Sequence, residues 1–238
     1  MANLRLIYAN KLTQVNGAST AASLNDYKSQ TQNGTTFTLT TSSITGPVAV
    51  VAMLANTTGT VTMTVTGQTG VVEATTSNVN TSPNVGYGGT KYIAKYFTLA
   101  SGTTSFTVTF SQAVDVSRFI VGNYWIPKYN IPFGISVGFD DATTIERLQS
   151  GDQYTTVMPR SKTMSFELAY LDESDKFYLF DLVRTIGKTS PVFVSAFPED
   201  SYQDKEQMYS IYGRFNTPPN IAHNVYTMYA SSIQLDEI

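Results

Sequence analysis

Threonine alternates with apolar residues along three separate stretches in the first half of the chain. Residues 36–40 read Thr-Phe-Thr-Leu-Thr, residues 60–66 read Thr-Val-Thr-Met-Thr-Val-Thr, and residues 106–110 read Phe-Thr-Val-Thr-Phe. A period of two places the apolar side chains on one face of a strand and the threonines on the other. We therefore predict antiparallel strands with one face on a core, a pattern that favours sheets over helix bundles.

Further strands and turns complete this half. Residues 48–54 are apolar at every position, as expected for a central strand that is covered on both faces. Turn-forming residues separate the strands at Asn33-Gly34, Thr45-Gly46-Pro47 and Ser101-Gly102. We interpret residues 67–90 as a long excursion between strands. Several short strands at this spacing predict a β-sandwich of jelly-roll type.

The composition changes after Pro127, where an apolar strand that contains the only Trp ends. Residues 1–128 carry seven Lys and Arg against three Asp and Glu, whereas residues 129–238 carry eight against fifteen. Of the threonines, 25 lie in the first part and 9 in the second. We therefore predict two domains, a β-sandwich over residues 1–127 and a second unit over residues 128–238.

The second unit mixes strands with one helix. Residues 164–170 alternate, with Met164, Phe166, Leu168 and Tyr170 on one face. Asp172 can cap a helix over about 172–186, and Gly187 is placed to end it. Strands are expected at 134–139, 191–197, 207–215 and 224–235. The predicted fold is mainly β, with the sandwich followed by a smaller α+β unit, a sheet or split barrel with one helix. The helix has a stripe of apolar residues, namely Phe177, Leu179, Phe180, Leu182, Val183 and Ile186.

Composition also restricts the function. The chain has no Cys, so it forms neither disulfides nor thiolate metal sites. A net charge of −3 without clusters of Lys and Arg gives no nucleic-acid-binding signature. The start of the chain does not read as a signal peptide, and the longest apolar stretch, residues 47–55, is too short to span a membrane. We expect a soluble protein.

Few residues could support catalysis. His223 is the only histidine, and we interpret it as a structural imidazole in a loop or at a strand edge. Asp140 and Asp141 could act as a pair in glycoside hydrolysis or bind a cation, but neighbours on a strand point to opposite faces. The Gly86–Gly89 segment has neither the Gly-Lys-Thr ending nor the following helix of a phosphate-binding loop. We predict no catalytic residue, no metal site and no cofactor.

Three aromatic residues are candidates for contact with a glycan or a partner protein. Tyr87 lies within the glycine-rich stretch and Tyr92 follows it, and both could stack on sugar rings, as aromatic side chains do in sandwich-type carbohydrate-binding modules. Trp125 is either a ligand platform or a core residue that packs where the two domains join. For both tyrosines the alternative is that the ring fills out a strand or loop.

Several segments of the chain resemble minor tail and tail-tip proteins of long-tailed bacteriophages. They are Gly122–Pro127, Phe133–Asp141, Met164–Leu168, the helix that Asp172 opens, Pro191–Glu199 and the closing strand from Tyr226 to Ile238. The resemblance covers roughly the second half of the chain and the point where the domains join.

The resemblance implies a structural protein of the virion. In distal tail proteins of such phages, a β-rich domain with a helix forms a ring that continues the tail tube, and a second β-sandwich projects outward. It implies a homo-oligomeric ring or collar, a trimer or a hexamer, with other phage tail proteins as partners and assembly in the host cytoplasm. Here the sandwich comes first, so a central ring and a peripheral collar both stay open. Carbohydrate binding to a cell surface is the alternative function, and a glycosidase that uses Asp140 and Asp141 is the third.

Overall fold

The structure is a computed structural model in which the chain forms two compact units. The first comprises residues 1–127 and 192–210, and the second comprises residues 128–191 and 211–238. The first segment therefore ends where we expected the domain boundary, but residues 192–210, which we expected in the second unit, pack with the first. The structure describes residues 3–16, 18–19, 32–55, 60–68, 72–80, 91–131, 134–147, 149, 151–158, 160–198, 203–225 and 228–238.

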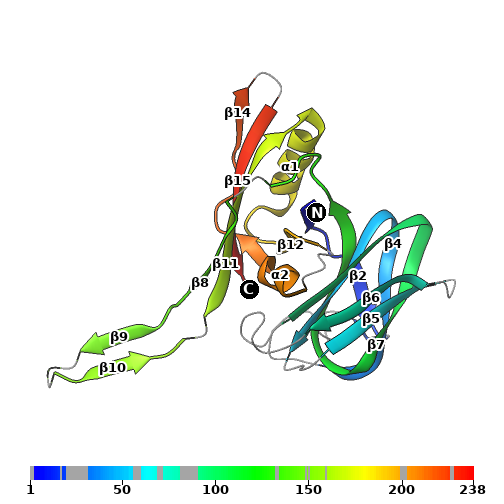
Figure 1. Ribbon diagram of the computed structural model, residues 1–238, viewed down its shortest axis with the longest axis horizontal. Helices are drawn as coiled ribbons and strands as arrows, with labels where there is room; N and C mark the ends of the chain where they lie inside the picture. Colours follow the sequence, from blue (N-terminus) through cyan, green and yellow to red (C-terminus); the bar gives the residue numbers. More distant parts are fainter. Residues whose placement is uncertain are drawn as a thin grey trace. The chain divides into compact units, whose positions relative to one another are not determined.

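Unit 1 is an antiparallel β-sandwich, and the mainly β fold is confirmed (Figure 1). Two long strands, β4 and β7, run through both of its layers, and this is possible because they bend where their pairing register shifts. The strands of unit 1 are β1 (Arg5–Ile7), β2 (Leu12–Val15), β3 (Ala18–Ser19), β4 (Gln32–Ala55), β5 (Thr60–Gly67), β6 (Val72–Asn80), β7 (Lys91–Trp125) and β12 (Val192–Ser195).

The pairing of β4 with β7 defines the two layers. In one layer, residues 36–40 of β4 pair with residues 105–109 of β7, and β2, β3, β5 and β6 extend the sheet on either side. In the other layer, residues 48–54 of β4 pair with residues 91–97 on one side and residues 116–123 on the other. Strands β1 and β12 continue that layer. The central position of residues 48–54 explains why all seven of these residues are buried.

The core of unit 1 lies between the two layers. The apolar residues of all three alternating stretches are buried, as predicted from their period of two. Phe37 of the first layer packs against Phe119 of the second at 5.2 Å between ring centroids, and it also contacts Phe110 at 5.9 Å. The stretch of residues 67–90 that we interpreted as an excursion contains strand β6, which pairs with β5.

A short helix, α2 (Gln203–Met208), completes unit 1. The side-chain amide of Gln207 accepts a hydrogen bond from the backbone N–H of Tyr92 at 2.8 Å and donates one to the carbonyl of the same residue. A side chain thus replaces a neighbouring strand at the edge of β7. Our prediction of a strand from residue 207 was wrong at its start, because residues 207 and 208 belong to α2.

Unit 2 is a sheet with one helix on it. The sheet order is β13 (Ser210–Phe215), β15 (Met228–Glu237), β11 (Ser161–Leu171) and β8 (Ser136–Asp140), and β14 (Ile221–Val225) also pairs with β15. Helix α1 (Glu173–Ile186) packs against β11 and β15 through Leu179, Leu182 and Ile186. Strands β9 (Thr144–Arg147) and β10 (Gln153–Thr156) form a separate two-stranded hairpin.

The alternation predicted for β11 holds up to Leu168. Met164, Phe166 and Leu168 are buried, but Tyr170 is 56% exposed and Leu171 is fully buried. The pairing with β15 shifts register between Leu168 and Leu171. Because of this bulge, the side chain that faces the core after Leu168 is Leu171 and not Tyr170. Our placement of Tyr170 on the core face was therefore wrong.

Helix α1 begins and ends where the sequence predicts. Asp172 accepts a hydrogen bond from the backbone N–H of Asp175 at 2.9 Å, and this bond is the first cause of the lowered pKa of Asp172. Gly187 has a φ of 51° and donates its N–H to the carbonyl of Val183 at 2.9 Å, which closes the helix.

We expect Asp172→Ala to lower the free energy of unfolding of unit 2 by about 1 kcal/mol, because the first turn loses its cap. Chemical denaturation followed by circular dichroism measures this loss. Asp181→Ala is the matched control, since the side chain of Asp181 is exposed and forms an ion pair with Arg184 on the same helix. Equal effects of the two substitutions would contradict a capping role for Asp172.

Lys162 on β11 is buried, and burial lowers its pKa to about 8, although the Glu237 carboxylate acts in the opposite direction. Between pH 8 and 10.5 the unfolded chain holds this proton more tightly than the folded chain, so stability rises with pH over that window. We expect Lys162→Met to be more stable than the wild type at pH 7, and this advantage to shrink by roughly 3 kcal/mol by pH 10.5. Urea titrations of both proteins across this pH range measure the difference between their free energies of unfolding. A difference that does not change with pH would contradict the lowered pKa.

Candidate functional site: an exposed arm and an aromatic groove

The hairpin of β9 and β10, which we call the arm, has no other strand paired with it among the described residues (Figure 1). Every residue of β9 is exposed, and so are the first three of β10. Ile145 pairs with Thr155 and lies on one face of the hairpin, whereas Tyr154 pairs with Glu146 and lies on the other. Ile145 is 64% exposed and Tyr154 is 59% exposed. Both faces of the arm therefore carry an apolar side chain that its own chain leaves uncovered.

Asp141 holds the base of the arm. Its carboxylate lies 2.8 Å from Nε of Arg160 and accepts a hydrogen bond from the backbone N–H of Thr143 at 3.1 Å. Hydrogen bonds from Thr143 are the first cause of a pKa of Asp141 lowered to about 2, and Arg160 adds to them. The backbone N–H of Met158 donates to Thr143 across the hairpin at 3.3 Å. Asp141 is thus ionised and engaged in joining the two sides of the arm, and Asp140 is exposed beside it.

The second feature is a groove between α1 and strands β14 and β15 in unit 2. It has a volume of about 290 Å³. A second hollow of about 400 Å³ shares Phe180 and Ile221 with it and continues toward Val183, Arg184 and Pro219. Phe177 and Phe180 are each 62% exposed. The residues that line the first hollow are Lys176, Phe177, Phe180, Ile221, His223 and Tyr229.

A polar network organises one end of the groove. Nζ of Lys176 lies 2.5 Å from the Glu173 carboxylate and donates to the hydroxyl of Tyr229 at 3.2 Å. Tyr229 in turn donates to Glu173 at 3.0 Å. These bonds lower the pKa of Glu173, first through Lys176, and raise the pKa of Lys176, first through Glu173. All three side chains are held in place, so this end of the groove is preformed.

Aromatic stacking continues the network. The imidazole of His223 stacks on the ring of Tyr229, with centroids 4.6 Å apart and an angle of 22° between the planes. Nζ of Lys176 lies 4.3 Å from the centroid of Tyr229 and 4.4 Å from that of Phe177. His223 lies on β14, at a strand edge, and its neighbours are aromatic rings and a lysine. The arrangement provides aromatic rings, the ammonium group of Lys176 and the hydroxyl of Tyr229, which donates to the Glu173 carboxylate.

Of the residues that we proposed for glycan or partner contact, the structure describes Tyr92 and Trp125, and both are buried. The ring of Tyr92 is 4% exposed and packs against Phe193 at 5.6 Å, so it offers no face to a sugar. Trp125 is 7% exposed at the end of β7, where it pairs with Leu6 of β1. Tyr87 lies outside the described residues.

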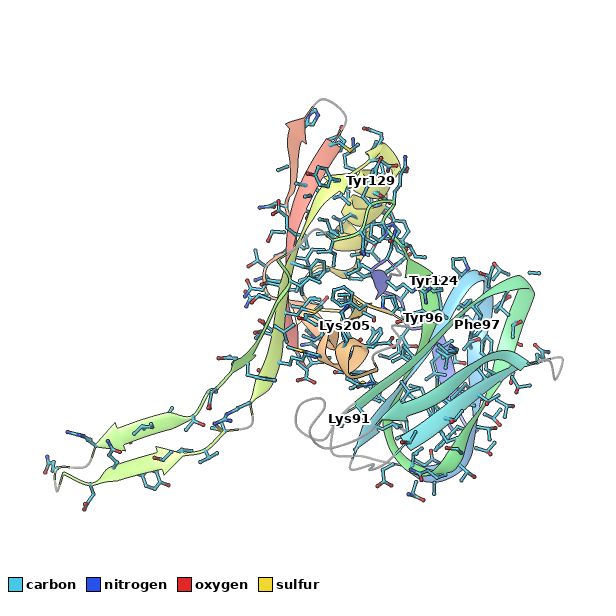
Figure 2. All side chains as sticks on the ribbon, viewed as in Figure 1. Lys91, Tyr96, Phe97, Tyr124, Tyr129 and Lys205 are labelled. Atoms are coloured by element: carbon cyan, nitrogen blue, oxygen red, sulfur yellow. The ribbon has the colours of Figure 1, made fainter. Side chains whose placement is uncertain are left out.

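Two other groups in unit 1 involve cations. The guanidinium of Arg5 lies 4.1 Å from the ring centroid of Tyr96 and 5.2 Å from that of Tyr124. The rings of Tyr96 and Tyr124, which Figure 2 labels, meet edge to face at 5.4 Å between centroids. Arg5 and Tyr124 are half-buried. Lys91 begins β7 and is 1% exposed, and burial lowers its pKa.

The described part of the chain contains no group of three or more His, Asp or Glu side chains that could hold a metal ion. Within that same part, no helix is long and apolar enough to cross a membrane.

No protein-family model matches the chain, and no curated protein matches it. Solved structures that share a weak likeness with it include three family 6 carbohydrate-binding modules. The C-terminal module of a marine laminarinase from Zobellia galactanivorans has 13% identity over 51% of this chain and 100% of its own, with a TM-score of 0.29. A module of a Cellvibrio mixtus lichenase, in complex with cellotriose, has 14% identity over 50% and 95%, with a TM-score of 0.28. The third has 18% identity over 50% and 92%, with a TM-score of 0.30. Likenesses of this size carry no argument about the ligand of this chain.

Proposed function

We propose that this chain is a structural protein that assembles with copies of itself through unit 2, and that it forms a ring or collar in the tail tip of a long-tailed bacteriophage. The arm is the observation that supports this proposal most strongly. An isolated two-stranded hairpin is marginally stable in water, and its unpaired edges invite pairing with another chain. Apolar side chains exposed on both of its faces add a second reason for a partner.

The type of assembly is inferred from the sequence resemblance to tail-tip proteins. The segments that resemble tail-tip proteins include β8, which leads into the arm, together with β11 and α1 of the unit that carries it. A non-catalytic role is in keeping with the environment of Asp141, whose carboxylate is occupied by Arg160 and Thr143. Hydrogen bonds from Thr143 and the neighbouring Arg160 keep the Asp141 carboxylate ionised, so Asp141 is not suited to be the proton donor of glycoside hydrolysis.

Electron microscopy tests this function at two levels. Negative-stain images of the purified full-length chain should show closed rings or collars, and gold-labelled antibodies should decorate the tail tip of intact virions of the phage that encodes it. A chain that is absent from the particles would contradict the virion role, whatever its behaviour in solution.

Carbohydrate binding by unit 1 is the second candidate function. Arg5 and Tyr124 support it, because a half-buried ring beside a guanidinium combines an apolar surface with hydrogen-bond donors, as ligand sites do. A glycan array with the full-length chain and with Tyr124→Ala tests it. Binding that the substitution reduces at least tenfold would favour the site, and no binding to any glycan at high concentration would remove it.

A further inference from the structure

The arm and the groove are two uncovered apolar features of one unit, and the strand register keeps them apart. The arm joins β8 to the start of β11, where Ser161 pairs with Asp140. The groove lies at the other end of β11, where Leu171 pairs with Tyr229 of β15. Strand β11 is 11 residues long, so its two ends lie roughly 33 Å apart. The arm of one chain therefore does not reach the groove of the same chain.

We propose that the groove between α1 and β14 receives the arm of a second copy of this chain, with the ring of Tyr154 seated against Phe177 and Phe180. This inference rests on the proposed self-assembly and names its contact surfaces. In such a head-to-tail interface, each copy contacts one neighbour through its arm and another neighbour through its groove. Such head-to-tail contacts close into rings when the rotation allows.

Shape and charge favour the arm as the occupant. Tyr154 is the large aromatic side chain on its face of the arm, and the groove volume of about 290 Å³ is at the lower end for small-molecule sites, which suits a single side chain. Glu146 is the cross-strand partner of Tyr154, so its carboxylate projects beside the ring. Arg184 lines the second hollow, which adjoins the groove at Phe180, and it forms an exposed ion pair with Asp181. An exposed pair of this kind exchanges partners at little cost, so Arg184 can meet Glu146.

The absence of cysteine from the chain allows a direct test by disulfide trapping. Tyr154→Cys and Phe180→Cys are made as separate variants, each checked by circular dichroism, and mixed in equal amounts under mild oxidation. We expect a covalent dimer in the mixture at least tenfold above the amount in either variant alone. Glu167→Cys, on an exposed position of β11, replaces Phe180→Cys in the control mixture and should give no such dimer.

Exchange of the charges of Glu146 and Arg184 gives a second test of the contact. Glu146→Arg and Arg184→Glu should each weaken self-association at least tenfold, and the double variant should restore it. Two failures are distinguishable. If the wild-type chain assembles but the trap gives no dimer and the double variant no recovery, the arm-in-groove contact is wrong and the proposed function stands. If the wild-type chain stays a monomer at about 100 µM, where a complex of micromolar affinity would be formed, the arm-in-groove contact and the proposed function are both overturned.

Discussion

Removal of the arm is expected to convert the assembled protein into a folded monomer. Residues 144–157 are replaced by Asn-Gly, a two-residue turn that joins Thr143 to Met158, which already meet across the hairpin. The sheet of unit 2 keeps all its strands, so the free energy of unfolding should change by less than about 1 kcal/mol. Self-association should weaken at least about 100-fold, which corresponds to about 3 kcal/mol. Sedimentation velocity and thermal denaturation measure the two effects.

The matched control for this deletion is Thr155→Ser, which keeps the arm and all its apolar side chains. It should assemble like the wild type. A deletion variant that still forms the same oligomer would show that the arm is not the assembly element, even if the protein itself is a ring.

The largest effect on stability is expected from Phe37→Ala. The ring of Phe37 is 1% exposed and contacts Phe119 across the sandwich and Phe110 within the core. Its truncation removes this contact between the layers and leaves a cavity, which costs about 3–5 kcal/mol. Differential scanning calorimetry should show a fall in Tm of roughly 10 °C or more for the transition of unit 1.

Thr38→Ala is the control for the core substitution, because Thr38 is the next residue of the same strand and is exposed. It should cost less than about 1 kcal/mol. A Phe37 variant that unfolds within 1 kcal/mol of the wild type would contradict a core built from both layers.

The sequence predicts best the parts of the fold that local patterns determine. The apolar residues of the alternating stretches 36–40, 60–66 and 106–110 face the core as expected, because strand geometry places every second side chain on the same face. Helix α1 is correct at both ends, since the Asp172 cap and Gly187 act within one turn of the chain. The bend of β4 and β7 through both layers depends on pairings between distant residues, which no local pattern carries.

The candidate site was harder to predict. Phe177 and Phe180 read as part of one apolar helical stripe, but Leu179, Leu182 and Ile186 fill the buried face, and the two rings are exposed. A helical projection centred on the aliphatic residues could have shown this offset. The segment between Asp141 and Arg160 has only weak alternation, so the arm was missed. Tyr92 is buried because Phe193, which is distant in sequence, covers it.

The mass of the full-length wild-type chain in solution tests the central claim most directly. Sedimentation equilibrium from 1 to 100 µM should give a mass that rises to a whole multiple of 26.0 kDa, three or six for a closed ring. A mass that stays at 26.0 kDa, that of a single chain, at every concentration would contradict self-assembly through the arm of unit 2.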